Sequence, residues 1–172
     1  MLCAYLTLNT PIYKKVAILS FDFLLSKIFT EDSIKVISNK GWMHNGEENY
    51  HKKIGGEQPI DVAYTIIALS KFYDAFGDEE YLQKMKIAFD WFLGKNHLNQ
   101  IVYNPCTGGC YDGLEENYLN LNQGAESTVS YLMARLTLEK YFKTSYETIP
   151  EAYKMALIRT SKTNKHSQHV SL

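Results

Sequence analysis

Residues 103–126, YNPCTGGCYDGLEENYLNLNQGAE, form a long polar stretch that leads directly into an apolar segment. Most loops in compact domains have about 4 to 6 residues, and a much longer one is usually functional or disordered. The tyrosine and leucine side chains of this stretch can pack against the protein, which favours an ordered loop. We therefore expect an ordered, functional loop around which the remaining chain is arranged.

The end of this loop has a counterpart earlier in the chain. Gln123 precedes Glu126 by three positions, and Gln58 precedes Asp61 by three positions. Each pair opens an apolar helical pattern, and the second pair follows the first by 65 positions. This spacing predicts an imperfect repeat of inner helix, tight turn, outer helix and long loop.

Apolar residues at helical spacing predict an all-α protein. The segments 59–76 and 123–142 are apolar around almost the whole circumference, which predicts inner helices surrounded by protein. Residues 79–95 keep one apolar stripe, which is typical of an outer helix. Together with helices at 12–29 and 147–158, these segments predict αα-hairpins joined by long loops.

The remaining segments have no helical periodicity. Residues 1–9 are expected to form an extended lead-in, residues 34–37 a short β-prone run, and residues 39–56 a second polar, ligand-facing loop. Residues 160–172 have little to bury and are expected to be a disordered tail. We therefore expect one α/α-hairpin domain over residues 1–159.

The composition limits the classes of partner. With 172 residues, 45% of them hydrophobic and 22% charged, the chain is long enough for one globular domain. It has 18 basic and 19 acidic residues, and this balance favours neither nucleic acid nor an anionic membrane surface as a partner. A neutral ligand fits this charge better.

The number and spacing of the cysteines limit the possible redox and metal chemistry. Cys3, Cys106 and Cys110 are too few for a disulfide framework, and the N-terminus lacks the pattern of a secretory signal, so we expect a cytoplasmic protein. Cys106 and Cys110 are four positions apart, but no second pair of metal ligands lies near them in the sequence. We expect no metal and no cofactor.

Landmarks spread over the segment from about Ser20 to Tyr141 carry a family resemblance. They are NKGW at 39–42, GEQPID at 56–61, FDWFLGKN at 89–96, TGGCYDGL at 107–114 and NQGAES at 122–127. In this order they resemble an α-helical toroid region of a bacterial and archaeal family. In that family the region often follows a group 1 glycosyltransferase domain, and it is similar in architecture to the six-hairpin glycosidases.

The resemblance implies an (α/α) barrel and a role in carbohydrate metabolism. Because a closed six-hairpin toroid needs a longer chain, we expect a partial toroid. The open ends of such an arc leave inner helices without neighbours on one side, and exposed apolar patches usually mark an interface. We therefore expect self-association or docking to a glycosyltransferase domain.

A glycoside-processing enzyme is one function that this pattern favours. Asp61 and Glu126 start the two inner helices, whose axes would lie about 8 to 10 Å apart as neighbours. Two carboxyl groups about 6.5 to 9.5 Å apart suit inverting hydrolysis, in which one protonates the leaving oxygen and the other activates water. Asp112 or Glu57 could replace either acid.

Other side chains of the two long loops are candidates for sugar binding. Aromatic rings offer stacking faces to sugars, and amides offer hydrogen bonds to hydroxyl groups. The candidate substrate-binding residues are Trp42, His44, Gln58, Tyr103, Tyr111, Asn122 and Gln123.

Two other functions remain open at this point. We expect Gln58, Asp61, Gln123 and Glu126 to line one shared cleft. This cleft could bind a glycan without catalysis, or serve as a helper region for a glycosyltransferase. Alternatively, the chain could be a structural scaffold, because an acid in a first helical turn is stabilised by the helix dipole by about 0.3 to 1 kcal/mol. On that account Asp61 and Glu126 are ordinary helix starts.

Overall fold

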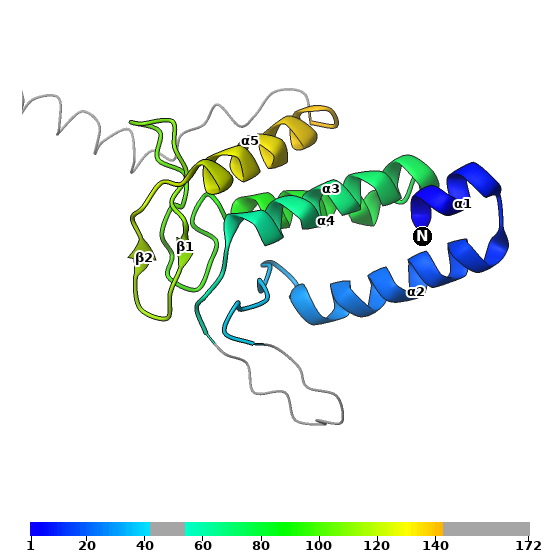
Figure 1. Cartoon of the computed structure of the whole chain (residues 1–172), viewed down its shortest axis with the longest axis horizontal. Coiled ribbons are helices and arrows are strands. Elements are labelled where there is room, and N and C mark those ends of the chain that lie inside the picture. Colours follow the sequence, from blue (N-terminus) through cyan, green and yellow to red (C-terminus); the bar gives the residue numbers. More distant parts are fainter. Residues whose placement is uncertain (42–53, 143–172) are drawn as a thin grey trace, which may run out of the picture. The chain divides into compact units, whose positions relative to one another are not determined.

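The computed structural model describes residues 1–41 and 54–142, and residues 1–141 belong to one compact unit. This part of the chain is mainly helical, which confirms the predicted all-α class (Figure 1). Its elements are α1 (Leu2–Leu8), α2 (Pro11–Ile28), α3 (Pro59–Phe76), α4 (Glu79–Asp90), β1 (Gly113–Leu114), β2 (Leu119–Asn120) and α5 (Ala125–Glu139).

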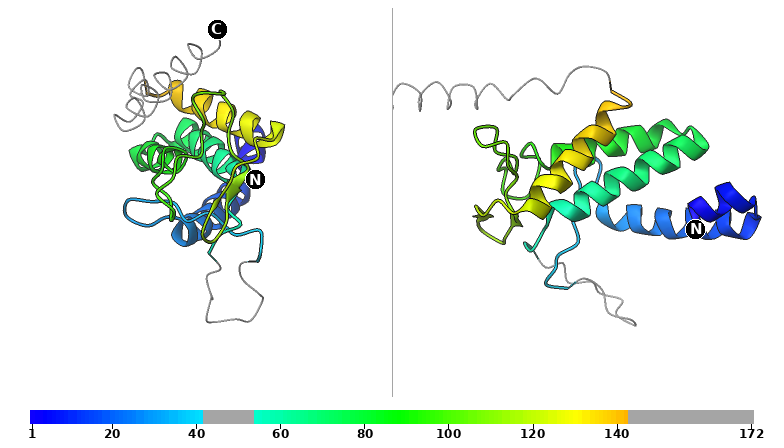
Figure 2. Two further views of the ribbon diagram at one scale, coloured as in Figure 1. Left: turned by 90° about the vertical axis from the view of Figure 1, so that its left-hand side faces the viewer. Right: turned by 45° about the horizontal axis from the view of Figure 1, so that its top comes forward.

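Helix α3 is the centre of the core. It packs against both α4 and α5, and Figure 2 shows α5 on one side of α3 and α2 on the other. On the α2 side, the rings of Phe21 and Phe72 stack with their centroids 4.0 Å apart. The side chains of α3 at positions 62, 66 and 69 are fully buried, at the spacing of one helical face.

The hairpin of α3 and α4 follows from local sequence signals. Pro59 occupies the first turn of α3, where its missing N–H group costs nothing. Gly77 ends the helix in the left-handed conformation at φ 68°, and its N–H donates to the Tyr73 carbonyl. The Asp78 side chain then accepts a hydrogen bond from the Glu80 N–H and caps α4. The predicted helix over residues 59–76 and the tight turn after it are confirmed.

The prediction of an extended lead-in over residues 1–9 is wrong. Residues 2–8 form α1, which ends at Asn9 in the left-handed conformation and packs against α2. Helix formation buries Leu2 and places the Tyr5 ring near the Lys14 ammonium group, 5.6 Å from the ring centroid. Thr10 is extended before Pro11, as a residue before proline usually is, so the chain turns between two helices.

Helix α4 ends at Asp90, earlier than the predicted Lys95. Residues 91–94 form a turn, and the side chains of Trp91 and Phe92 are fully buried. A continued helix would carry these neighbouring aromatics on different faces, whereas the turn places both in the core. The predicted β-prone run at residues 34–37 forms a single β-bridge, between Phe29 and Ile34. Helix α5 begins and ends within the predicted range of residues 123–142.

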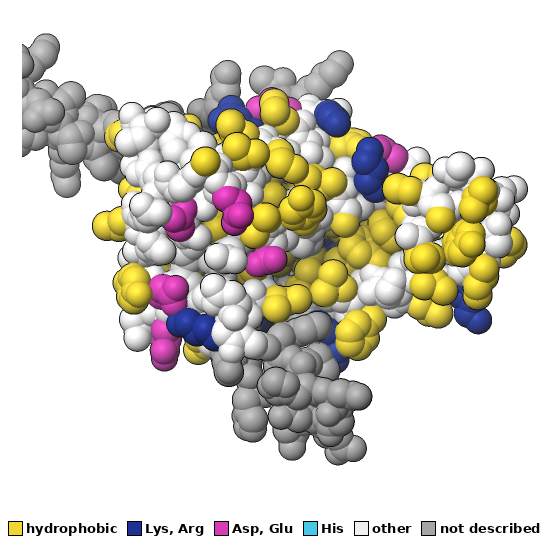
Figure 3. All heavy atoms as spheres, in the orientation of Figure 1, with side chains coloured by type: hydrophobic (Ala, Val, Ile, Leu, Met, Phe, Trp, Pro, Cys, Tyr) yellow, Lys and Arg dark blue, Asp and Glu magenta, His cyan; other side chains and the backbone are white. Residues whose placement is uncertain are grey.

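The prediction that the helices at 59–76 and 123–142 are surrounded by protein is also wrong. Four apolar side chains of α5 and one of α3 are exposed, and Figure 3 shows exposed apolar side chains gathered over α5 and over the α1 end of the molecule. Helix α2 also carries an exposed apolar stripe with spacings of four, three and four. The exposed residues are Tyr64 on α3, Val129, Leu132, Met133 and Leu136 on α5, and Ile12, Val16, Leu19 and Phe23 on α2.

Candidate functional site

A short hairpin inside the loop at 103–126 joins this loop to the start of α3. Strand β1 pairs with β2, and on its other edge Leu114 pairs with Glu57 through two backbone hydrogen bonds of 2.9 and 3.0 Å. Gly113 allows this approach, because a Cβ there would lie 2.2 Å from the Glu57 carbonyl oxygen. The loop therefore reaches the residues that precede α3.

Asp112 fixes the start of α5. Its Oδ1 accepts hydrogen bonds from the Gly124 N–H at 2.8 Å and the Ser127 hydroxyl at 2.7 Å, and its Oδ2 accepts one from the Asn122 amide. Burial by itself would raise the pKa of Asp112, but these hydrogen bonds outweigh it and lower the pKa below its usual value. The ionised carboxylate thus acts as a remote cap at the positive end of the helix dipole.

Replacing Asp112 with alanine should lower the free energy of unfolding by about 2 to 3 kcal/mol near neutral pH, because it leaves several donors unpaired. A carboxyl with a lowered folded-state pKa contributes stability above its unfolded-state value, here 3.8, and loses it as the pH falls through the folded-state value. The difference between wild type and variant should therefore shrink below about pH 4.

Urea denaturation at pH 7 and pH 3 measures this effect. Asp78→Ala is the matched control, because it removes an exposed cap with one hydrogen bond and should cost about 1 kcal/mol. If Asp112→Ala destabilised the protein equally at both pH values, the carboxylate would not be the stabilising group.

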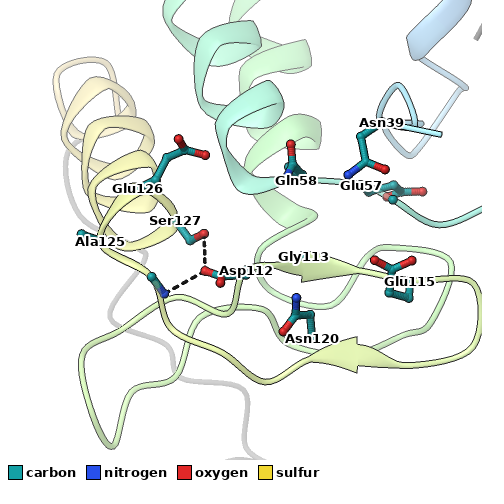
Figure 4. A pocket seen from close by; sticks show the side chains of 12 residues that line it. Asn39, Glu57, Gln58, Asp112, Gly113, Glu115, Asn120, Ala125, Glu126 and Ser127 are labelled. Atoms are coloured by element: carbon teal, nitrogen blue, oxygen red, sulfur yellow. Dashed lines mark hydrogen bonds between the residues drawn. The ribbon is translucent and has the colours of Figure 1, made fainter. Parts of the chain in front are cut away.

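A polar pocket of about 370 Å³ lies between the starts of α3 and α5 and the hairpin. Figure 4 shows Glu126 extending from the first turn of α5 toward the α3 side, where Gln58 lies, with Asp112 and Asn120 nearer the hairpin. Its lining residues are Asn39, Gly56, Glu57, Gln58, Asp112, Gly113, Glu115, Asn120, Gly124, Ala125, Glu126 and Ser127. Carboxylates and amides dominate this surface, so it offers hydrogen bonds to a polar ligand.

The charge of Glu126 acts electrostatically on Asp61. The pKa of Asp61 is raised, first because the carboxyl is partly withdrawn from water and second because of the negative charge of Glu126. The Asp61 residue as a whole remains exposed, so solvent reaches part of it. A raised pKa favours the protonated form, which is what a general acid needs.

The Glu57 carboxyl group belongs to a buried hydrogen-bond network that the sequence pattern does not indicate. Only 7% of the residue is exposed, and its Oε2 accepts a hydrogen bond of 2.8 Å from the Trp91 indole N–H. Its Oε1 lies 3.1 Å from His97 Nδ1, while His97 Nε2 lies 2.9 Å from the Glu115 carbonyl oxygen. A carbonyl only accepts, so Nε2 donates to it, and a further proton must lie between Nδ1 and the carboxyl group.

The four residues predicted to share one cleft are placed in different ways. Gln58 and Glu126 line the polar pocket, and Asp61 lines a neighbouring hollow. Gln123 is not among the lining residues, and its Oε1 accepts a hydrogen bond of 2.6 Å from the Thr107 hydroxyl. The cleft therefore includes two of these four residues.

Two of the predicted stacking residues, Tyr103 and Tyr111, do not line the polar pocket. The Tyr103 ring stacks on the Tyr131 ring at 4.2 Å, and the Tyr111 hydroxyl accepts a hydrogen bond from the Asn104 amide. Trp42 and His44 lie outside the described residues. Their proposed contacts with a sugar stay predictions.

The chemistry of Cys110 does not favour a nucleophile. The residue is fully buried, and burial, with a smaller contribution from the charge of Asp112, raises its pKa to about 12. Cys106 is exposed. Within residues 1–41 and 54–142 no group of three or more His, Cys, Asp or Glu side chains is placed to hold a metal ion. Among the described helices, none is both long and apolar enough to span a bilayer.

No known protein-family model matches this sequence, and no curated protein matches it. The polar pocket and the groups around it therefore carry the functional proposal.

Proposed function

We propose that this protein binds a carbohydrate in the polar pocket and that Asp61 and Glu126 form the acid–base pair of a glycoside hydrolase. The observation that carries the proposal is the pair itself. Two acids start the two adjacent helices α3 and α5, and the charge of Glu126 helps to raise the pKa of Asp61. In glycosidases, the two catalytic acids typically have different pKa values because their surroundings differ.

The two acids take different roles in an inverting reaction. Asp61 donates its proton to the glycosidic oxygen as the bond from that oxygen to the anomeric carbon breaks, and the aglycone leaves as an alcohol. Glu126 accepts a proton from a water molecule whose oxygen forms the new bond to the anomeric carbon. After both steps Asp61 is ionised and Glu126 is protonated, and proton exchange with water restores the starting state.

The other two candidate acids are supporting groups in this proposal. The Asp112 carboxylate is already occupied by hydrogen bonds that cap α5, and the Glu57 carboxylate by contacts with Trp91 and His97. Both hold the pocket wall in place. Gln58 and Asn120 would donate hydrogen bonds to the sugar hydroxyl groups.

The arrangement of the helices supports a partial (α/α) toroid as the finer description of the fold. Helix α3 and helix α4 form one hairpin joined by a tight turn, and α5 returns beside α3. In a partial toroid of this kind α3 and α5 would be inner helices and α4 an outer one.

A helper region for a group 1 glycosyltransferase is the second candidate. The exposed apolar stripes of α2 and α5 favour it, because such surfaces usually mark contact with another protein. In this alternative the pocket binds a glycan without cleaving it, and the stripes pair with a second copy or dock to the glycosyltransferase.

Release of a chromophore from a panel of nitrophenyl glycosides tests the proposal. Asp61→Asn and Glu126→Gln should each lower kcat by about 100-fold or more, because each removes a proton-transfer group. Glu139→Gln, at the exposed end of α5, is the matched control and should change kcat less than about twofold.

Saturation-transfer NMR with the same sugars separates the two candidates. Binding that Glu126→Gln weakens, without any hydrolysis, would favour the helper function. The absence of both binding and hydrolysis across the panel would contradict carbohydrate recognition in this pocket.

A further inference from the structure

A second hollow, of about 400 Å³, lies between α2, the chain that follows α2, and α3. In contrast to the polar pocket, its surface is almost entirely apolar. The lining residues are Phe21, Leu24, Ile28, Ile34, Val36, Ile37, Asp61, Tyr64, Thr65 and Ala68. Asp61 is the one charged residue among them. The volume lies in the range of about 300 to 1,000 Å³ that is typical of small-molecule sites.

The start of α3 contributes residues to both hollows. Gln58, just before the first turn, lines the polar pocket, and Asp61, three residues later, lines the apolar hollow. The Asp61 N–H donates a hydrogen bond of 3.2 Å to the Gln58 carbonyl oxygen, so the two residues are close neighbours at the start of α3. Asp61 also senses the charge of Glu126, which lines the polar pocket. Asp61 therefore lies in the apolar hollow close to the polar pocket.

The two surfaces suit two different parts of one ligand. Amides and carboxylates of the polar pocket match the hydroxyl groups of a sugar ring. The apolar hollow offers few such partners, and burying a hydroxyl group there without a hydrogen bond would be unfavourable. An alkyl chain or an aryl ring, by contrast, gains from leaving water for this surface.

We propose that the ligand is an amphipathic glycoside whose sugar occupies the polar pocket and whose alkyl or aryl aglycone occupies the apolar hollow. This inference rests on the proposed function, because it names the substrate class of the same site. The glycosidic oxygen, which joins the two parts of such a ligand, would then lie beside Asp61. In the hydrolysis described above, the proton of Asp61 goes to this oxygen and the aglycone departs as an apolar alcohol.

Isothermal titration calorimetry with matched ligands tests the inference. The probes are methyl and n-octyl glycosides of glucose, galactose and mannose, with 1-octanol alone, all below the concentration at which micelles form. For the sugar that binds, the octyl glycoside should have a Kd at least about tenfold lower than the methyl glycoside, because the chain is buried. The octyl glycoside should also bind more tightly than 1-octanol.

Two variants locate the octyl chain. Ala68→Phe fills the hollow, and the ratio of methyl to octyl Kd should fall close to one. Ala75→Phe is the matched control, because Ala75 is on the same helix but does not line the hollow, and the ratio should persist. Should circular dichroism show that Ala68→Phe does not fold, Leu24→Ser makes the same surface less apolar and should also lower the ratio.

The outcomes separate this inference from the proposed function. Equal Kd values for methyl and octyl glycosides would overturn the apolar subsite and leave carbohydrate binding intact. A preference for octyl that Ala68→Phe and Leu24→Ser do not reduce would also overturn it. No binding of any sugar would overturn the proposed function and this inference together, and equal binding of 1-octanol would show that the sugar plays no part.

Discussion

Replacing Glu57 with alanine should lower the free energy of unfolding by about 3 to 5 kcal/mol, whereas replacing it with glutamine should lower it by less than about 1.5 kcal/mol. Alanine leaves the buried Trp91 N–H and the His97 Nδ1 without a partner. Removing one member of a buried polar or charged pair is strongly destabilising for this reason.

Glutamine can satisfy both neighbours without the additional proton. Its side-chain oxygen accepts from Trp91, and its amide group donates to the Nδ1 lone pair of a neutral His97 whose Nε2–H stays on the Glu115 carbonyl. The native carboxyl needs a proton between itself and Nδ1 to make the same contact. Glutamine at position 57 should therefore preserve the geometry of this network.

Urea denaturation, followed by tryptophan fluorescence and circular dichroism, measures both variants. Glu139→Gln controls for the loss of a carboxylate at an exposed position. Similar losses for the alanine and glutamine variants would mean that the side-chain volume of Glu57, and not its hydrogen bonds, stabilises this part of the core.

Replacing Gly55 with alanine should destabilise the protein by about 3 kcal/mol or more, while Gly108→Ala should cost only about 1 to 2 kcal/mol. The two glycines have nearly the same left-handed conformation, with φ of 81° and 76°. Both variants therefore share the strain of a left-handed alanine, about 1 to 2 kcal/mol. At Gly55, however, the added Cβ would lie 2.3 Å from the backbone nitrogen of Glu116, whereas at Gly108 it meets no atom within 4 Å.

The difference in destabilisation between the two variants measures the cost of the clash between the added Cβ at position 55 and the backbone of Glu116. To relieve it, the turn at residues 115–116 must move away from the segment that enters α3, and this turn carries the Glu115 carbonyl that holds His97. The free energy of unfolding from urea denaturation gives the cost, and amide chemical shifts at residues 115–116 show whether the turn has moved. Equal costs for both variants would contradict the close approach.

Much of the helical framework could be predicted from local signals. Pro59 and Gly77 correctly predict where α3 begins and ends, because each acts through its own backbone conformation. The end of α4 could not be predicted in this way. Residues 91–94 leave the helix because Trp91 and Phe92 fill the core, and that depends on tertiary packing.

The candidate site could be predicted only in part. The repeat of a glutamine before an acid correctly indicated two adjacent helix starts, so Gln58 and Glu126 line one pocket. It gave no sign of the side-chain direction, and Gln123 turns to Thr107 instead. The contact of Glu57 with Trp91 spans 34 positions. Nothing periodic in the sequence links such residues, because Glu57 and Trp91 meet only through packing in the buried interior.

The dual position of Asp112 has a consequence for ligand recognition. One carboxylate caps α5 and also lines the polar pocket, so the pocket wall is as ordered as the first turn of that helix. A ligand that binds only when this wall is formed must stabilise the first turn, and fraying of the turn must weaken binding by the same free energy. Recognition in the pocket and local opening of α5 are thus thermodynamically reciprocal, with Asp112 as the group that couples them.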